Sequence, residues 1–262
     1  MIKQELPELE EKSIYVIREA KLKFKKIAAL WSMGKDSTTM LALTRKAFLG
    51  KVPFPVIHID NSIDFPETYQ FRQELADKWN LDLIVAKSEI KPDMVGSACC
   101  GKNKPEALKK VMAEYGFDAL IVSIRRDEHG VRAKERYMSP RDKNWKWDYK
   151  NQVAELWDDY TSKLDTKGHV RVHPLLDWNE IDIWRYVRQE RVPVNPLYFS
   201  RNGYRYRSLG CTHCTVPLKS NAKSVDDIIK ELEVTKDEER GGRSMDKERE
   251  YAMLRLRALG YM

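Results

Sequence analysis

A short string of glycine, charged and hydroxyl residues stands between an apolar run at 26–32 and a helical pattern at 35–50. It reads Ser32-Met33-Gly34-Lys35-Asp36-Ser37. Glycine permits a tight turn and close approach of the backbone to a ligand, and a helix N-terminus offers N–H groups and a positive dipole end to an anion. A structural turn is the alternative, but the flanking pattern favours phosphate binding. The expected phosphate ligands are Ser32, Gly34, Lys35, Asp36, Ser37 and Thr38.

A cluster of basic residues follows the apolar run at 118–124. Its members lie within twelve residues of one another: Arg125, Arg126, Arg132, Lys134 and Arg136. Open α/β sheets bind ligands at the carboxyl ends of their strands, and guanidinium groups match the geometry of phosphate and sulfate. Without a phosphate loop in the same chain, such a cluster would more simply be a solvent-exposed basic surface. Beside a phosphate loop, it favours oxyanion binding.

The four cysteines form two close pairs. Cys99 and Cys100 are adjacent, and Cys211 and Cys214 form C-x-x-C. Four thiolates suit tetrahedral zinc or a [4Fe–4S] cluster. Reduced structural thiols and a redox disulfide remain open, and His213 fits a loop residue better than a ligand.

Composition limits the class of protein. The chain has 262 residues, a net charge of +7 and no run of 18 apolar residues, and its first residues lack an apolar secretory region. We expect a soluble cytoplasmic protein with no membrane segment. The basic excess favours anionic ligands and is compatible with nucleic acid, although a solvated surface with extra lysines explains it equally well.

Alternating apolar and helical segments predict an α/β fold, a mainly parallel sheet with helices on both faces. We expect strands at 26–32, 54–60, 81–87 and 118–124, and helices at 1–25, 35–50, 65–80, 104–117 and 179–192, the last with Asn179 as N-cap. Residues 125–170 and 193–221 read as long loops. A charged C-terminal arm ends in a helical pattern at 246–262, which orders over a ligand or is simply solvated. The expected domains are an N-terminal helix (1–25), a central domain (26–200) and a cysteine loop with the arm (201–262).

The S-x-G-K-D-S string resembles the PP-loop of ATP pyrophosphatases. With RRDE at 125–128, NPLY at 195–198 and GYRYRSLGC at 203–211, the chain from about residue 28 onward resembles the phosphoadenylyl-sulfate reductase and sulfate adenylyltransferase small-subunit family. That resemblance implies an adenine nucleotide alpha hydrolase-like fold and an AMP-forming transfer from ATP, with Mg²⁺, to sulfate. It also implies a GTPase large subunit as partner, and a homodimer fits it too.

The same resemblance implies roles for individual residues. The catalytic residues are Lys35, Asp36, Arg125, Arg126 and Arg132, and Asp60 lies near the nucleotide. The residues that hold the oxyanion are Arg132, Lys134, Arg136, Arg240 and Arg243.

The cysteines resemble those of adenylyl-sulfate reductases, in which a Cys-Cys pair and a distant C-x-x-C bind [4Fe–4S]; zinc is the alternative. The reductases also carry a nucleophilic cysteine near the C-terminus. This chain ends RLRALGYM without one, which argues against sulfate reduction. The family usually continues the second strand with Thr-Gly, whereas this chain has Asn61-Ser62.

Three functions therefore compete. The first is a sulfate adenylyltransferase small subunit. The second adenylates a nucleic acid for sulfur insertion, as in DNA phosphorothioation or tRNA thiolation. The basic segment with Trp145 and Trp147 fits that partner, although packing beneath the loop explains the tryptophans slightly better. The third, a non-catalytic nucleotide or Fe–S sensor, is disfavoured by the intact phosphate loop.

Overall fold

The computed structural model describes residues 5–88, 104–128, 132, 134–147, 152, 155, 168–235 and 239. Its helices are α1 (Leu6–Lys23), α2 (Lys35–Ala47), α3 (Pro66–Trp79), α4 (Lys104–Tyr115), α5 (Glu180–Glu190), the short 3₁₀ helix η4 (Pro196–Tyr198) and α6 (Val225–Val234). The strands are β1 (Ile27–Leu30), β2 (Val56–Asp60), β3 (Leu83–Lys87), β4 (Ala119–Ile121), β5 (Met138–Arg141), β6 (His169–Val172), β7 (Tyr204–Arg205) and β8 (Leu218–Lys219). Every strand and helix predicted before residue 120 is present, with slightly shorter bounds.

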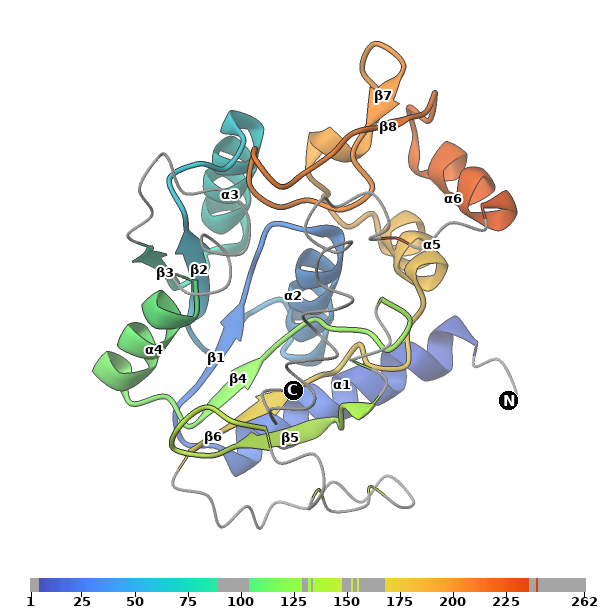
Figure 1. The fold of residues 1–262 in the computed structure, drawn as a ribbon. Helices are drawn as coiled ribbons and strands as arrows, with labels where there is room; N and C mark the ends of the chain where they lie inside the picture. The colour runs from blue at the N-terminus through green and yellow to red at the C-terminus, as the bar shows by residue number, and fades with distance from the viewer. Residues whose placement is uncertain are drawn as a thin grey trace.

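The main sheet has the strand order β3-β2-β1-β4-β6-β5. All neighbouring strands run parallel except β5, which pairs antiparallel with β6 at one edge. The carboxyl ends of β1, β2 and β4 therefore meet at one edge of the sheet, and the segment that carries β7 and β8 lies beyond the ends of β1 and β2 (Figure 1). This confirms the predicted α/β class.

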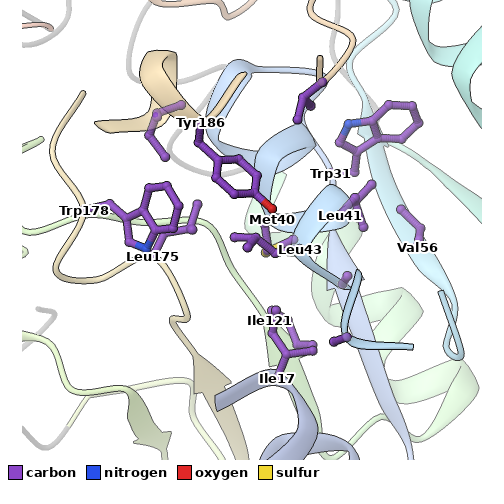
Figure 2. Close-up of a cluster of buried hydrophobic side chains, with 14 of the residues drawn as sticks. Ile17, Trp31, Met40, Leu41, Leu43, Val56, Ile121, Leu175, Trp178 and Tyr186 are labelled. Carbon is purple, nitrogen blue, oxygen red and sulfur yellow. The ribbon is translucent and has the colours of Figure 1, made fainter. Parts of the chain in front are cut away.

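Helices cover both faces of the sheet. Side chains alternate along each strand, so Ala28, Ile57 and Leu120 face α4, whereas Ala29, Val56 and Ile121 join the larger core with α1, α2, α3 and α5. In Figure 2, Met40, Leu41 and Leu43 of α2 are grouped with Ile17 of α1 and Ile121 of β4, all fully buried. This packing fixes the start of α2 against the end of β1.

Two predictions about the second half are wrong in detail. Residues 125–170 are not a single long loop, because β5 lies within them as an edge strand. Its sequence, MSPR, has no strand pattern of its own, and Pro140 suits an edge strand because proline cannot donate a ladder hydrogen bond. Residues 193–221 are not one long loop either, because η4, β7 and β8 lie within them. After them comes α6, for which no helix was predicted, and its Ile228 and Ile229 are buried in the larger core.

The start of α5 agrees with the sequence. Asn179 is the N-cap, and its backbone N–H donates to the Asp182 carboxylate at 3.1 Å. In the part of the chain described here, no helix is long and apolar enough to cross a membrane.

Candidate functional site

The phosphate loop links the end of β1 to the start of α2. Gly34 is the N-cap of α2, and the preceding residue, Met33, has a left-handed φ of 56°. A Cβ on Gly34 would lie 3.3 Å from Ser32 Oγ and 3.4 Å from the Tyr198 hydroxyl, so a larger residue would push on both. The Ser32 N–H donates to Ser37 Oγ at 3.2 Å. The loop is thus compact, and a Cβ at this position would crowd the Ser32 hydroxyl.

Two adjacent clefts open beside this loop. One, of about 820 Å³, has apolar walls that include Leu30 of β1, Ile57 of β2 and Val122, the residue after β4. The other, of about 540 Å³, is lined mainly by polar and charged side chains of the loop and its neighbours. They share Ser32, Ser123 and Leu209. An apolar cleft next to a charged one suits a ligand with a flat apolar end and an anionic end.

Lys35 supplies a buried positive charge to the polar cleft. Its side chain is 1% exposed, and its Nζ lies 3.2 Å from Asp36 Oδ2 and 4.0 Å from Glu180 Oε1. It also pairs with Glu239. The backbone N–H of Lys35 donates to the Tyr198 hydroxyl at 2.8 Å. The first turn of α2 therefore presents an ammonium and a helix N-terminus in one place.

Arg125 is the second buried cation at the site. It follows β4 and is fully buried, with its Nε 2.9 Å from Asp127 and its two terminal nitrogens paired with Asp36 and Glu239. Burial alone would lower the pKa of Arg125, but Glu239 and Asp127 raise it above the ordinary value. The guanidinium is therefore held charged, next to Lys35, through their shared partners Asp36 and Glu239.

The structure brings together only part of the predicted basic cluster. Arg132 lines the polar cleft and pairs with Glu128. Arg126 instead pairs with Asp177, and its guanidinium lies 5.8 Å from the Tyr137 ring. Lys134 is exposed, and neither it nor Arg136 is among the residues lining the two clefts. Arg132 is thus the member of the cluster that lines a cleft, and Arg125 reaches the site through its partners Asp36 and Glu239.

Two predicted nucleotide residues have structural partners. The Thr38 hydroxyl accepts from Trp31 Nε1 at 3.1 Å and lies outside both clefts. Asp60, at the end of β2, accepts from the Ser62 N–H at 2.8 Å and from the Tyr69 hydroxyl at 2.9 Å. Partial burial raises the pKa of Asp60, but these hydrogen bonds lower it overall. Ser62 has a φ of 59°, a left-handed conformation at the position where the family pattern has glycine.

The predicted cysteine turn borders the site. Cys211 and Cys214 are buried against Ile63, and the Thr212 N–H donates to the Ile63 carbonyl at 3.0 Å. Residues just before the turn, Ser208 and Leu209, line the polar cleft. The turn is therefore held close to the end of β2 and to both clefts. The other predicted residues, Cys99, Cys100, Arg240 and Arg243, lie outside the described residues.

A second group of metal-type ligands lies at the end of β2. His58, Asp60 and Asp64 each place a ligand atom within 4.8 Å of the others. Burial, with Arg72, lowers the pKa of His58 to about 4, so its imidazole is neutral at pH 7. The Asp60 oxygens pair with Tyr69 and Ser62 on one side and with Arg72 on the other, and we assign no metal to this group.

Several site residues were not predicted from the sequence. Glu180, at the start of α5, lies 4.0 Å from Lys35 and accepts from Arg207 at 2.8 Å. Its backbone N–H donates to Asp127 at 2.8 Å, which connects it to Arg125. The others are Tyr198 and Glu239. Tyr198 ends the NPLY string and Glu239 stands next to the RGGR string, and these strings were the available signals.

The tryptophans of the basic segment are used for packing. Trp147 is 5% exposed and its Nε1 donates to Gln152 at 2.9 Å. The Trp145 ring lies 4.1 Å from the His169 ring. The packing interpretation of this pair is therefore confirmed: Trp147 is buried, and Trp145 is partly buried and packs against the core.

Comparisons with known proteins agree with this architecture. Residues 26–217 match the phosphoadenosine phosphosulfate reductase domain. The sulfate adenylyltransferase subunit 2 of Aeromonas hydrophila subsp. hydrophila is 40% identical over 98% of this chain and 97% of its own, and that of Ectopseudomonas mendocina is 38% identical over 98% and 97%. An FMN adenylyltransferase from Candida glabrata has a similar fold, with a TM-score of 0.61, 18% identity and coverage of 91% of this chain and 87% of its own. A phosphoadenylyl-sulfate reductase from Candida auris, at a TM-score of 0.54 and 19% identity, covers 82% of this chain and 98% of its own.

Proposed function

The chain belongs to the phosphoadenosine phosphosulfate reductase domain family, and from this membership and the two adjacent clefts we propose the reaction that it catalyses. It is an ATP pyrophosphatase like sulfate adenylyltransferase subunit 2, which transfers AMP from ATP to sulfate and releases pyrophosphate. The observation that carries the proposal is the apolar cleft that shares Ser32, Ser123 and Leu209 with a polar cleft lined by Lys35. Arg125 lies behind that polar cleft and pairs with its residues Asp36 and Glu239.

The geometry suggests how the reaction proceeds. Adenosine lies in the apolar cleft and the phosphates extend past Ser32 to the start of α2. A sulfate oxygen bonds to the α-phosphorus, the bond from that phosphorus to the bridging α–β oxygen breaks, and pyrophosphate leaves. Lys35 and Arg125 stabilise the negative charge that develops on the leaving group. No protein nucleophile takes part.

Mg²⁺ fits this site because it prefers oxygen ligands. Asp36 and Glu128 place carboxylates along the polar cleft. Of these, Asp36 is the residue we assign to hold the ion together with the phosphates. When bound, Mg²⁺ supplies charge neutralisation for the leaving pyrophosphate.

Sulfate is the acceptor we favour, and Arg132 is the group we assign to it. Arg132 lines the polar cleft, and its guanidinium suits a tetrahedral oxyanion. The relatives are named as second subunits of sulfate adenylyltransferases. We therefore also propose that this chain works with a partner subunit, a GTPase by family resemblance, because the formation of adenylyl sulfate is strongly uphill.

An acceptor test separates sulfate from nucleic acid. With ATP, Mg²⁺ and inorganic pyrophosphatase to remove the product, we expect phosphate release that depends on sulfate, with adenylyl sulfate as the second product. Single-stranded DNA or tRNA in place of sulfate is expected to give none. Release stimulated only by nucleic acid would refute the sulfate assignment and establish a nucleic-acid acceptor.

We further propose that Cys99, Cys100, Cys211 and Cys214 bind a [4Fe–4S] cluster, with zinc as the alternative. The buried turn that carries Cys211 and Cys214 supports this. Burial raises the pKa of Asp64, and both Lys104 and Cys211 are close enough to Asp64 to influence it. Cys100 stands four residues before Lys104 in the sequence, and this short separation favours one shared site for the two cysteine pairs.

Cys211→Ser is expected to lose most of the bound metal, because each thiolate supplies a quarter of a tetrahedral ligand set. Iron, acid-labile sulfide and zinc are measured after anaerobic purification. His213→Ala is the matched control in the same turn; His213 is exposed, and we expect the variant to keep its metal. Full iron or zinc in Cys211→Ser would show that Cys211 is not a ligand.

A further inference from the structure

A carboxylate of the protein lies in the cleft assigned to the phosphates. Glu239 pairs through one oxygen with Lys35 and through the other with Arg125. Its side chain is only 6% exposed and lines the polar cleft together with Ser32 and Gly34. Glu239 therefore engages both buried cations of the site at once.

This arrangement reproduces the way a phosphate would bind. A lysine and an arginine that share one anion, at the N-terminus of a helix, are typical phosphate ligands. Burial alone would raise the pKa of Glu239, but Lys35 and Arg125 hold it well below the ordinary value. The group is therefore an anion at neutral pH, and an ATP phosphate on the same two cations would meet its charge at close range.

Glu239 differs from the other carboxylates of the site in its place in the fold. Asp36 belongs to the first turn of α2 and Glu180 to the first turn of α5. Glu239 instead lies beyond the end of α6 at Val234 and is 204 positions from Lys35 along the chain. It can leave the cleft without breaking a helix or strand described here, whereas Asp36 and Glu180 cannot.

We propose that Glu239 is a tethered competitor of the ATP phosphates, a carboxylate that occupies their site until ATP or pyrophosphate displaces it. The proposal rests on the proposed function, since it takes Lys35 and Arg125 as phosphate ligands. Because Glu239 must first leave, the apparent affinity for the nucleotide is the intrinsic affinity multiplied by the fraction of molecules in which the site is open. Glu239 thereby raises the concentration of ATP needed to occupy the site. In the absence of ATP, it keeps Lys35 and Arg125 paired.

The test measures the binding of pyrophosphate by calorimetry, with Mg²⁺ present and no acceptor. Glu239→Gln keeps the shape of the side chain and removes its charge. We expect it to bind pyrophosphate about tenfold more tightly than the wild type. Glu233→Gln is the control. Glu233 lies on α6, is half exposed and pairs with Arg185 at 3.2 Å, and this variant is expected to bind as the wild type does.

Each other outcome has a definite meaning. Equal affinities of wild type and Glu239→Gln would overturn the inference and leave the phosphate site intact. Weaker binding by Glu239→Gln would also overturn it, and would make Glu239 a ligand of the bound Mg²⁺ complex. Failure of the wild type and both variants to bind pyrophosphate would overturn the proposed function, and this inference with it.

Discussion

Lys35→Met reduces the rate of pyrophosphate formation by about 10²–10³-fold, if the charge assigned to this side chain stabilises the transition state. The Lys35 ammonium is 1% exposed and lies within 4 Å of Asp36 and Glu180, at the start of α2. Methionine keeps the length and the apolar stem of the side chain while removing the charge. The rate is measured with saturating ATP and sulfate, and the melting temperature confirms that the variant is folded.

Lys46→Met is the matched control, on the same helix. Its ammonium pairs with Glu10 and Glu190 at the surface, with 42% of the side chain exposed. Exposed ion pairs contribute about 0–1 kcal/mol to stability, so this variant is expected to fold normally. Because Lys46 lines neither cleft, we expect the wild-type rate. A wild-type rate for Lys35→Met as well would show that the buried ammonium takes no part in catalysis.

Arg125→Met is expected to abolish pyrophosphate formation and to destabilise the protein. Arg125 holds Asp36, Asp127 and Glu239 together in the interior. Removing one partner of a buried ion pair typically costs about 3–5 kcal/mol of unfolding free energy, because it leaves an uncompensated charge. Denaturant unfolding measures this loss, and it is expected to appear as a lower midpoint at an unchanged slope.

Arg125→Lys keeps the positive charge but cannot reproduce three contacts from one planar group. We expect it to fold and to lose about 10²-fold in rate. The neighbouring Arg126→Lys is the control, because its partner Asp177 lines neither cleft, whereas the Arg125 partners Asp36 and Glu239 line the polar one. Equal losses in the two lysine variants would contradict the distinction that the structure makes between these adjacent arginines.

The sequence predicted the first half of the fold because each element there has its own local signal. The runs at 26–32 and 54–60 are apolar and short, and the helix from Lys35 follows a glycine N-cap. By contrast, β5 is a strand only because β6 offers it an edge to pair with. Its residues, MSPR, carry no alternation of apolar and polar side chains that would predict a strand.

The candidate site was predictable where its residues are close in sequence. Ser32, Gly34 and Lys35 lie on one loop, and the structure keeps them together at the polar cleft. Glu180 and Glu239 reach Lys35 from 145 and 204 positions away along the chain. Such long-range contacts depend on where the fold places the start of α5 and Glu239, and a single sequence carries no pattern for them.

Arg126 shows a further limit of sequence reasoning. It stands beside Arg125 at the end of the same strand, and both suited an anion. The two side chains nevertheless take different partners: Arg125 pairs with Asp36 and Glu239, which line the polar cleft, and Arg126 pairs with Asp177. The spacing of the basic cluster predicted an anion site. Which of these side chains belong to the site depends on the partners that the fold gives each of them.

The reverse reaction tests the central claim most directly, because it is downhill and needs no GTPase. The chain is supplied with adenylyl sulfate, pyrophosphate and Mg²⁺, and ATP is measured by luciferase light emission. The proposed function predicts ATP formation that requires both substrates and is lost in Lys35→Met. No ATP from wild-type protein that binds pyrophosphate would contradict the transfer of AMP to sulfate at this site.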